Sequence, residues 1–154
     1  LVLDSRPKRA RNVVDLFAGM GTFALRLAES MPVAPFDSDR AAIDALVKAT
    51  RMTKGLKPVT VGTRNLFNAP LTTVELREYP WAVLDPPRAG AEAQCRTLAA
   101  SSVGHVTYVS CDAQTFARDA KTLTQGGFSL RSVTAVDQFK WTAHVELVGV
   151  FSRK

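Results

Sequence analysis

The sequence has 154 residues with a formal net charge of +6, and 46% of its residues are hydrophobic. This length fits one domain over residues 1–154 that buries an ordinary core. No run approaches the roughly 20 apolar residues that cross a membrane. The first residues also lack the basic start and the apolar segment of a signal peptide. We therefore expect a cytoplasmic monomer that has no membrane contact.

Short apolar runs alternate with helical patterns along the chain. Strands are expected over residues 12–17, 33–36, 57–61, 81–84, 105–109, 128–136 and 145–151. Helices are expected over residues 22–29, from Ser38 or Asp39 as N-cap to residue 51, and over 92–100 and 113–123, while 64–78 is irregular. Gly126 and Gly127 suit the end of the last helix.

This order of elements predicts an α/β fold, with a mostly parallel sheet covered by helices on both faces. The last two strands leave no room for a helix between them, so we expect an antiparallel pair at the C-terminus. Ligands of such sheets bind at the carboxyl ends of the strands. The expected strand ends carry Phe17, Asp37, Asn65, Asp85 and Cys111.

The first expected strand leads into a turn that contains Gly19 and Gly21 and then directly into a helix. Glycine allows a sharp turn and close approach of a ligand, and the helix N-terminus favours an anionic or polar group. The pattern suits a nucleotide-like cofactor, an ordinary strand–turn–helix corner or, with Ala24, the dinucleotide fingerprint. Asp37 lies 18 residues after Gly19. It is predicted to bind ribose hydroxyls, with a helix N-terminal acid as the alternative.

Two further segments carry reactive side chains. Asp85 precedes two prolines that stiffen the backbone, and its carboxylate or a nearby carbonyl can bind the edge of a planar base. Cys111 precedes an expected helix, whose N-terminus favours a thiolate, whereas Cys95 is predicted to be structural. Glu146 begins an apolar run and is either an outward-facing residue or, if buried, a general base.

The two cysteines are too few for a disulfide framework, which favours a reducing compartment. They and the two histidines, His105 and His144, form no cluster with zinc spacing, and we expect no metal site. The positive charge is partly grouped, at Arg6, Lys8, Arg9 and Arg11 and again at Lys48, Arg51, Lys54, Lys57 and Arg64. This excess suits a nucleic-acid partner, and it equally suits a solvated basic surface.

Four segments together resemble the RNA (uracil-5-)methyltransferase family. They are DLFAGMGTF at 15–23, DPPRAG at 85–90, YVSCDAQTFARD at 108–119 and DQFKWTAHVELV at 137–148. The likeness covers about residues 12–152, and the last three segments in this order are far more specific than the glycine turn. It implies a Rossmann-like class I methyltransferase domain that uses S-adenosylmethionine to methylate carbon 5 of uridine in tRNA or rRNA.

The resemblance also implies roles for the matched residues. Cys111 would be the nucleophile and Glu146 the general base, while Asp85 and Arg88 would contact the substrate. The cofactor would be held by Phe17, Gly19, Gly21, Thr22, Asp37, Asn65 and Asp85. Members of the family carry RNA-binding segments ahead of this domain, so we expect a fragment without them. A nicotinamide-dependent oxidoreductase domain and a catalytically silent RNA-binding fragment are the alternatives.

Overall fold

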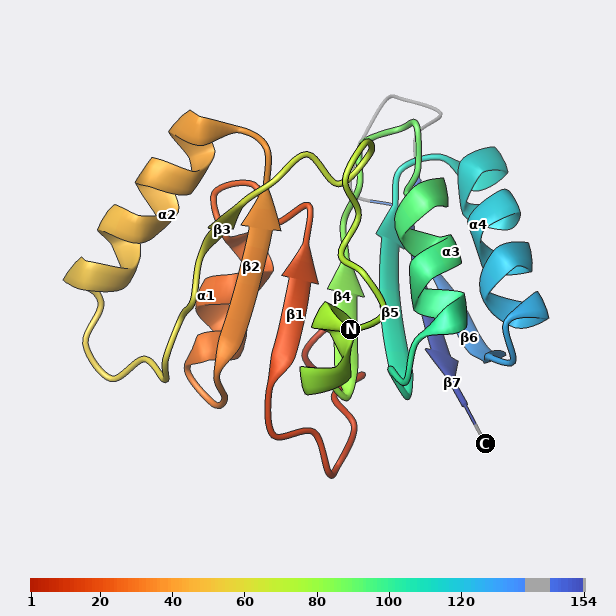
Figure 1. Ribbon diagram of the computed structural model, residues 1–154, viewed down its shortest axis with the longest axis horizontal. Helices are drawn as coiled ribbons and strands as arrows, with labels where there is room; N and C mark the ends of the chain where they lie inside the picture. The colour runs from red at the N-terminus through yellow and green to blue at the C-terminus, as the bar shows by residue number, and fades with distance from the viewer. Residues whose placement is uncertain (138–144, 154) are drawn as a thin grey trace.

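The computed structural model describes residues 1–137 and 145–153 and contains one seven-stranded sheet with helices packed against it (Figure 1). The strands are β1 (Val13–Leu16), β2 (Val33–Asp37), β3 (Gly62–Thr63), β4 (Trp81–Leu84), β5 (His105–Ser110), β6 (Ser129–Val136) and β7 (Glu146–Ser152). The helices are α1 (Thr22–Ala28), α2 (Arg40–Met52), α3 (Glu92–Ala100) and α4 (Ala113–Gln125), with a 3₁₀ turn, η1, at Glu75–Glu78.

The strand order is β3-β2-β1-β4-β5-β7-β6. The pairs among β1 to β5 are parallel, whereas β7 runs antiparallel to both β5 and β6. The predicted parallel sheet and its antiparallel C-terminal pair are therefore confirmed. The position of β7 in the sheet was not predicted: the last strand lies between β5 and β6, and β6 forms the sheet edge.

The core has one cluster on each face of the sheet, because successive side chains of a strand point to opposite faces. In β1, Val14 and Leu16 pack on the face covered by α3 and α4. Val13 packs on the other face, with Leu27 of α1 and Val2 of the N-terminal segment. Burial on both sides explains why β1 and β4 are short apolar runs instead of alternating ones.

The expected strand over residues 57–61 was wrong. The chain makes only an isolated bridge there, between Val33 and Val59, and true pairing with β2 begins at Gly62. Pro58 has no N–H to donate to a ladder. At Gly62 a Cβ would lie 2.3 Å from the ring of Phe36, so glycine lets the chain come close enough to pair.

The helix ends agree closely with the predicted caps. The Asp39 side chain accepts a hydrogen bond from the Ala42 N–H at the start of α2. Gly126 ends α4, and Gly127 has a left-handed backbone with φ of 92°. No helix within the described residues is long and apolar enough to cross a membrane.

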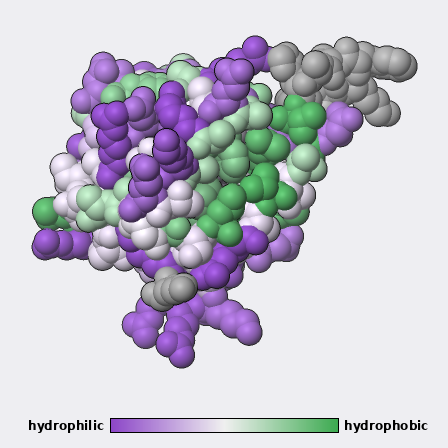
Figure 2. All heavy atoms as spheres, turned by 90° about the vertical axis from the view of Figure 1, so that its right-hand side faces the viewer, coloured by the Kyte–Doolittle hydropathy of each residue, from purple (hydrophilic) through white to green (hydrophobic). Residues whose placement is uncertain are grey.

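Strand β6 forms one edge of the sheet, and most of its residues are exposed or half-buried. Figure 2 views the molecule from the side of Figure 1 on which β6 and β7 lie, and it shows hydrophobic surface beside hydrophilic side chains. Leu130 and Val133 of this edge strand are exposed large hydrophobic residues, and so is Val145, which directly precedes β7. Residues 138–144 of the C-terminal motif, with His144, lie outside the described residues.

Candidate active site

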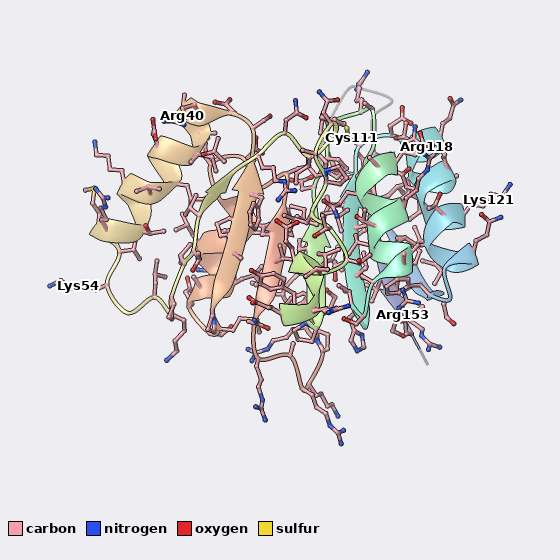
Figure 3. The ribbon with its side chains drawn as sticks, viewed as in Figure 1. Arg40, Lys54, Cys111, Arg118, Lys121 and Arg153 are labelled. Atoms are coloured by element: carbon pink, nitrogen blue, oxygen red, sulfur yellow. The ribbon has the colours of Figure 1, made fainter. Side chains whose placement is uncertain are left out.

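The predicted site residues gather at the carboxyl ends of the parallel strands β1, β2, β4 and β5, which all lie on the same side of the sheet's mid-line. Phe17, Asp85 and Cys111 each directly follow one of these strands, and Asp37 is the last residue of β2. Glu146 begins β7, which runs the opposite way, so it lies on the same side. Figure 3 labels Cys111 near these strand ends, at the top of the view.

The glycine turn after β1 is tied to the end of β2. The backbone N–H of Gly19 donates to Asp37 Oδ2 at 2.8 Å, and the N–H of Asp39 donates to Oδ1 at 2.9 Å. Phe17 has a positive φ of 63°, a strained conformation for a residue with a side chain. The Asp37 carboxylate therefore organises the turn, and each of its oxygens keeps a further lone pair for a ligand.

Gly21 is required by both backbone conformation and space. Its φ is 89°, and a Cβ would lie 2.4 Å from a methyl group of Leu46, which is fully buried. At Gly19, with φ of 53°, a Cβ would have no neighbour within 4 Å among the described residues. Gly21 thus packs α1 against α2, while Gly19 leaves open space above the turn.

Replacing Gly21 with alanine is expected to destabilise the protein more than replacing Gly19. Both variants carry the cost of left-handed backbone, about 1–2 kcal/mol. Gly21→Ala also forces a methyl group against Leu46, which adds about 1–3 kcal/mol. Denaturant unfolding without ligand measures both values, and equal losses would contradict the packing role.

The loop after β3 places Asn65 at the surface beside an aromatic contact. The Asn65 Oδ1 atom accepts hydrogen bonds from the N–H groups of Phe67 and Asn68, at 3.0 and 3.3 Å. The rings of Phe67 and Phe17 lie 5.2 Å apart in a tilted arrangement. This loop therefore meets the glycine turn at the carboxyl ends of the strands, which brings Asn65 into the same region as Phe17.

Two neighbouring carboxyl groups of the site interact, one fully buried and one half-buried. Asp15 is fully buried, and neither oxygen has a hydrogen-bond partner among the described residues. Burial, then the neighbouring Asp85 and, more weakly, Asp37 raise the pKa of Asp15 to about 8. The backbone N–H of Ala24 faces Asp15 and lowers this pKa in part, although the two groups form no hydrogen bond. Burial and then Glu146 raise the pKa of Asp85 to about 6. The site therefore disfavours negative charge when it holds no cation.

The unliganded protein is expected to lose stability as pH rises from about 4 to about 8. Unfolded Asp15 releases its proton near 3.8, whereas the folded protein holds it until about 8. In this window the folded state binds more protons, so each rise in pH favours unfolding. Asp15→Asn should flatten the profile between about pH 6 and pH 8 and leave the contribution of Asp85 below about pH 6. Denaturant unfolding across this range tests it, and an unchanged slope in the variant would contradict it.

A cavity of about 430 Å³ brings part of the predicted site together. It is lined by Asp85, Glu146, Thr22, Phe23, Val109, Val136, Val148, Leu1 and Val2. Asp85, Glu146 and Thr22 were predicted as site residues. Cys111 is not among the described residues that line it.

The strand register nevertheless relates Cys111 to Glu146. In the β5–β7 ladder Val109 pairs with Val148 and Ser110 with Leu147. Continued by one residue, this register sets Cys111 opposite Glu146. Glu146 lies two positions from Val148 on β7, so it shares the face of the Val109–Val148 pair that lines the cavity, and Cys111 follows β5 at the same end of the ladder.

Cys111 is half-buried and directly precedes the cap of α4. Asp112 Oδ1 accepts hydrogen bonds from the N–H groups of Gln114 and Thr115, at 3.0 and 2.9 Å. The Thr115 bond lowers the pKa of Asp112, which keeps this carboxylate ionised. Cys95 is buried and its pKa is raised well above the ordinary value by burial, which confirms it as a structural thiol.

Arg88 is exposed in the loop after Pro86 and Pro87, and its carbonyl oxygen accepts a hydrogen bond from Thr115 Oγ1 at 3.0 Å. Sequence reasoning missed two buried acids in this region, Asp15 and Asp119. A signal existed for each of them. Asp15 is a lone charge inside a buried apolar run, and Asp119 has helical spacing with two buried residues of α4, Phe116 and Leu123.

The sheet order, the reversed β7, the glycine turn after β1 and the acid at the end of β2 define a Rossmann-like class I methyltransferase fold. The sequence profile of the tRNA (Uracil-5-)-methyltransferase family matches residues 2–154, and the chain belongs to this family. An oxidoreductase assignment is therefore excluded in favour of the methyltransferase family.

Individual relatives agree with this family. An uncharacterized RNA methyltransferase of Brucella melitensis is 50% identical over 94% of this chain and 35% of its own length. The 23S rRNA (uracil(1939)-C(5))-methyltransferase RlmD of Chromohalobacter salexigens is 37% identical over 96% of the chain and 30% of its own length. The chain thus spans about a third of the curated relatives it matches.

A solved structure shows the same fold. The tRNA (uracil-54, C5)-methyltransferase of Pyrococcus abyssi, in complex with S-adenosyl-L-homocysteine, matches with a TM-score of 0.83 and 28% identity. The match covers 97% of this chain and 36% of that one. A SAM-dependent methyltransferase of Methanosarcina mazei matches with a TM-score of 0.71 and 12% identity, which supports the fold alone.

Proposed function

We propose that this chain is the catalytic part of an enzyme that methylates carbon 5 of uridine in RNA, with S-adenosylmethionine as methyl donor. The observation that carries the proposal is the β5–β7 ladder: Cys111 and Glu146 lie at the same end of it, and Glu146 lines the cavity with Asp85. Family membership supports it. The relatives act on both tRNA and rRNA, so either class of RNA is a candidate substrate.

The glycine turn and its neighbours would hold the methyl donor. Open space above Gly19 and the free lone pairs of Asp37 suit a ribose, as in other doubly wound folds. The Asn65 amide nitrogen makes no hydrogen bond within residues 1–137 and 145–153 and can donate to an adenine ring. Phe17, Gly21 and Thr22 complete this set. The carboxyl groups of buried Asp15 and half-buried Asp85 suit a cationic donor, whose charge would favour their ionised forms.

Cys111 would activate the target base. Carbon 5 of uracil is a poor nucleophile, and attack of the Cys111 thiolate on carbon 6 turns the ring into an enolate with negative character at carbon 5. Bound S-adenosylmethionine supplies an electrophilic methyl group to that carbon. This is covalent catalysis, in which one difficult step becomes several easier ones. Cys111 directly precedes Asp112, the N-cap of α4.

Glu146 would complete the reaction. After methyl transfer, carbon 5 carries both the methyl group and a proton. The Glu146 carboxylate takes that proton, the enolate re-forms, and elimination expels the Cys111 thiolate to give 5-methyluridine. The Asp85 carboxylate can hold the polar edge of the base by accepting a hydrogen bond from the ring N–H of uracil. Arg88, on the exposed loop, would contact the RNA backbone.

The target uridine must leave its base stack to reach the cavity. A single-stranded or loop region makes this less costly than a helix. The net charge of +6 supports association with the RNA backbone.

A product analysis tests the proposed function. A polypeptide as long as the curated relatives is incubated with methyl-labelled S-adenosylmethionine and unmodified tRNA or 23S rRNA transcripts. Nuclease digestion and mass spectrometry should then find 5-methyluridine. Methylation of an exocyclic nitrogen, or no transfer to either RNA, would overturn the proposal. A catalytically silent RNA-binding fragment predicts RNA binding without any methyl transfer.

A further inference from the structure

Asp119 is a fully buried acid that the proposed mechanism does not use. Its Oδ2 accepts hydrogen bonds from the Ala91 N–H at 2.6 Å and from the Tyr108 hydroxyl at 2.7 Å, and Oδ1 accepts one from Arg118 Nε at 2.9 Å. Burial first, and also the Asp119 contact, raise the pKa of Tyr108, so this hydroxyl keeps its proton and donates. A buried carboxylate with three donors is a satisfied, ordered group.

The partners of this cluster belong to the loop that follows Asp85. Beside the bond from Ala91, Arg118 Nη2 donates to the carbonyl oxygen of Ala89 at 2.9 Å. The Thr115 hydroxyl donates to the carbonyl of Arg88 at 3.0 Å. Helix α4 therefore holds the backbone of residues 88–91 at three points.

Gly90 shows how closely the loop lies on the helix. Its φ is 76°, and a Cβ there would lie 2.5 Å from Arg118 Nη2 and 2.6 Å from Asp119 Oδ2. A side chain at this position would push the loop away from α4. The contact therefore depends on the glycine, which the Asp-Pro-Pro-Arg-Ala-Gly segment supplies.

The same cluster also reaches the strand that leads to Cys111. Tyr108 lies on β5 three residues before Cys111, and α4 begins two residues after it. We propose that Asp119 is a positioning residue: its buried carboxylate joins the loop after Asp85 to the strand and helix around Cys111 and so fixes the two sides of the uracil site relative to each other. This inference rests on the proposed function.

Thr115→Val is the mildest test, because it keeps the side-chain shape and removes the hydroxyl, which lies 3.0 Å from the Arg88 carbonyl oxygen and 3.3 and 3.2 Å from the carbonyl oxygen and Oδ1 of Asp112. Thr122→Val is the matched control on the same helix, since its hydroxyl bonds only to the Arg118 carbonyl one turn earlier, at 3.3 Å. We expect Thr115→Val to lower kcat about tenfold, because small displacements of reacting groups are costly. The control should keep wild-type kcat, and equal kcat in both variants would overturn the inference.

Asp119→Asn tests the carboxylate itself. An amide offers one acceptor oxygen to three donors and adds two N–H groups, so the cluster cannot stay satisfied. We expect kcat to fall about 100-fold, while the dissociation constant of S-adenosylhomocysteine stays within about twofold. Amide hydrogen exchange of residues 88–91 should speed up. A folded variant with wild-type kcat and exchange would contradict the positioning role.

These measurements separate the two proposals. If the wild-type polypeptide methylates no uridine, the proposed function fails, while exchange still reports whether Asp119 orders the loop. If the wild type is active and both variants match it, only the positioning role fails. A purely structural role of Asp119 predicts a lower melting temperature with unchanged kcat well below it.

Discussion

Replacing Cys111 with alanine is expected to abolish methylation of uridine, with kcat reduced by at least about 10³-fold. Without the thiolate no bond forms at carbon 6, and carbon 5 never becomes nucleophilic enough to take the methyl group. Release of tritium from RNA labelled at carbon 5 measures the reaction directly. The binding of S-adenosylhomocysteine should remain close to wild type, because the proposed cofactor residues belong to other segments, at and after the ends of β1 to β4.

Cys95→Ala is the matched control, because it makes the same substitution at the buried structural cysteine. It should cost stability through a small cavity and leave kcat near wild type below its melting temperature. Turnover by Cys111→Ala at a rate near that of this control would exclude a cysteine nucleophile at position 111.

Glu146→Gln should have the second largest effect. The amide cannot take the proton from carbon 5, so the reaction stops after methyl transfer and the enzyme stays bound to its RNA. Loss of a general base typically costs about 10²–10⁴-fold in rate. Denaturing gels should show a covalent complex between protein and unmodified RNA that the wild type does not accumulate.

Glu29→Gln serves as the control for this variant, since Glu29 is exposed just after α1 and pairs with Arg26 at 2.8 Å. This ion pair lies away from the carboxyl ends of the strands, where the proposed site is, so neither turnover nor complex formation should change. Normal turnover by Glu146→Gln would exclude Glu146 as the base.

Much of the site's location could be predicted because it depends on local patterns. Short apolar runs are ended or directly followed by four of the site residues, Phe17, Asp37, Asp85 and Cys111. Parallel strands bring such positions together at their carboxyl ends. The strand at 57–61 was mispredicted because the chain reaches the edge of the sheet there, where only one neighbour sets the pairing. Apolar residues near Pro58 indicate a strand, but they do not locate its contact with β2.

Other features depend on contacts between distant segments. The relation of Cys111 to Glu146 requires β7 to lie between β5 and β6, which no local pattern specifies. Asp119 has the right spacing to face inward from α4, yet its partners Ala91 and Tyr108 come from a loop and a strand. Leu1 lines the cavity with Glu146 for the same reason: the folded chain brings its first residues to β7.

The central claim is that Cys111 becomes covalently attached to carbon 6 of a uracil base. RNA containing 5-fluorouridine tests it most directly, because fluorine cannot leave as a proton and the covalent complex is trapped. We predict an adduct that requires S-adenosylmethionine, carries the transferred methyl group and maps by peptide mass spectrometry to Cys111. No adduct, or an adduct that still forms in Cys111→Ala, would contradict this mechanism.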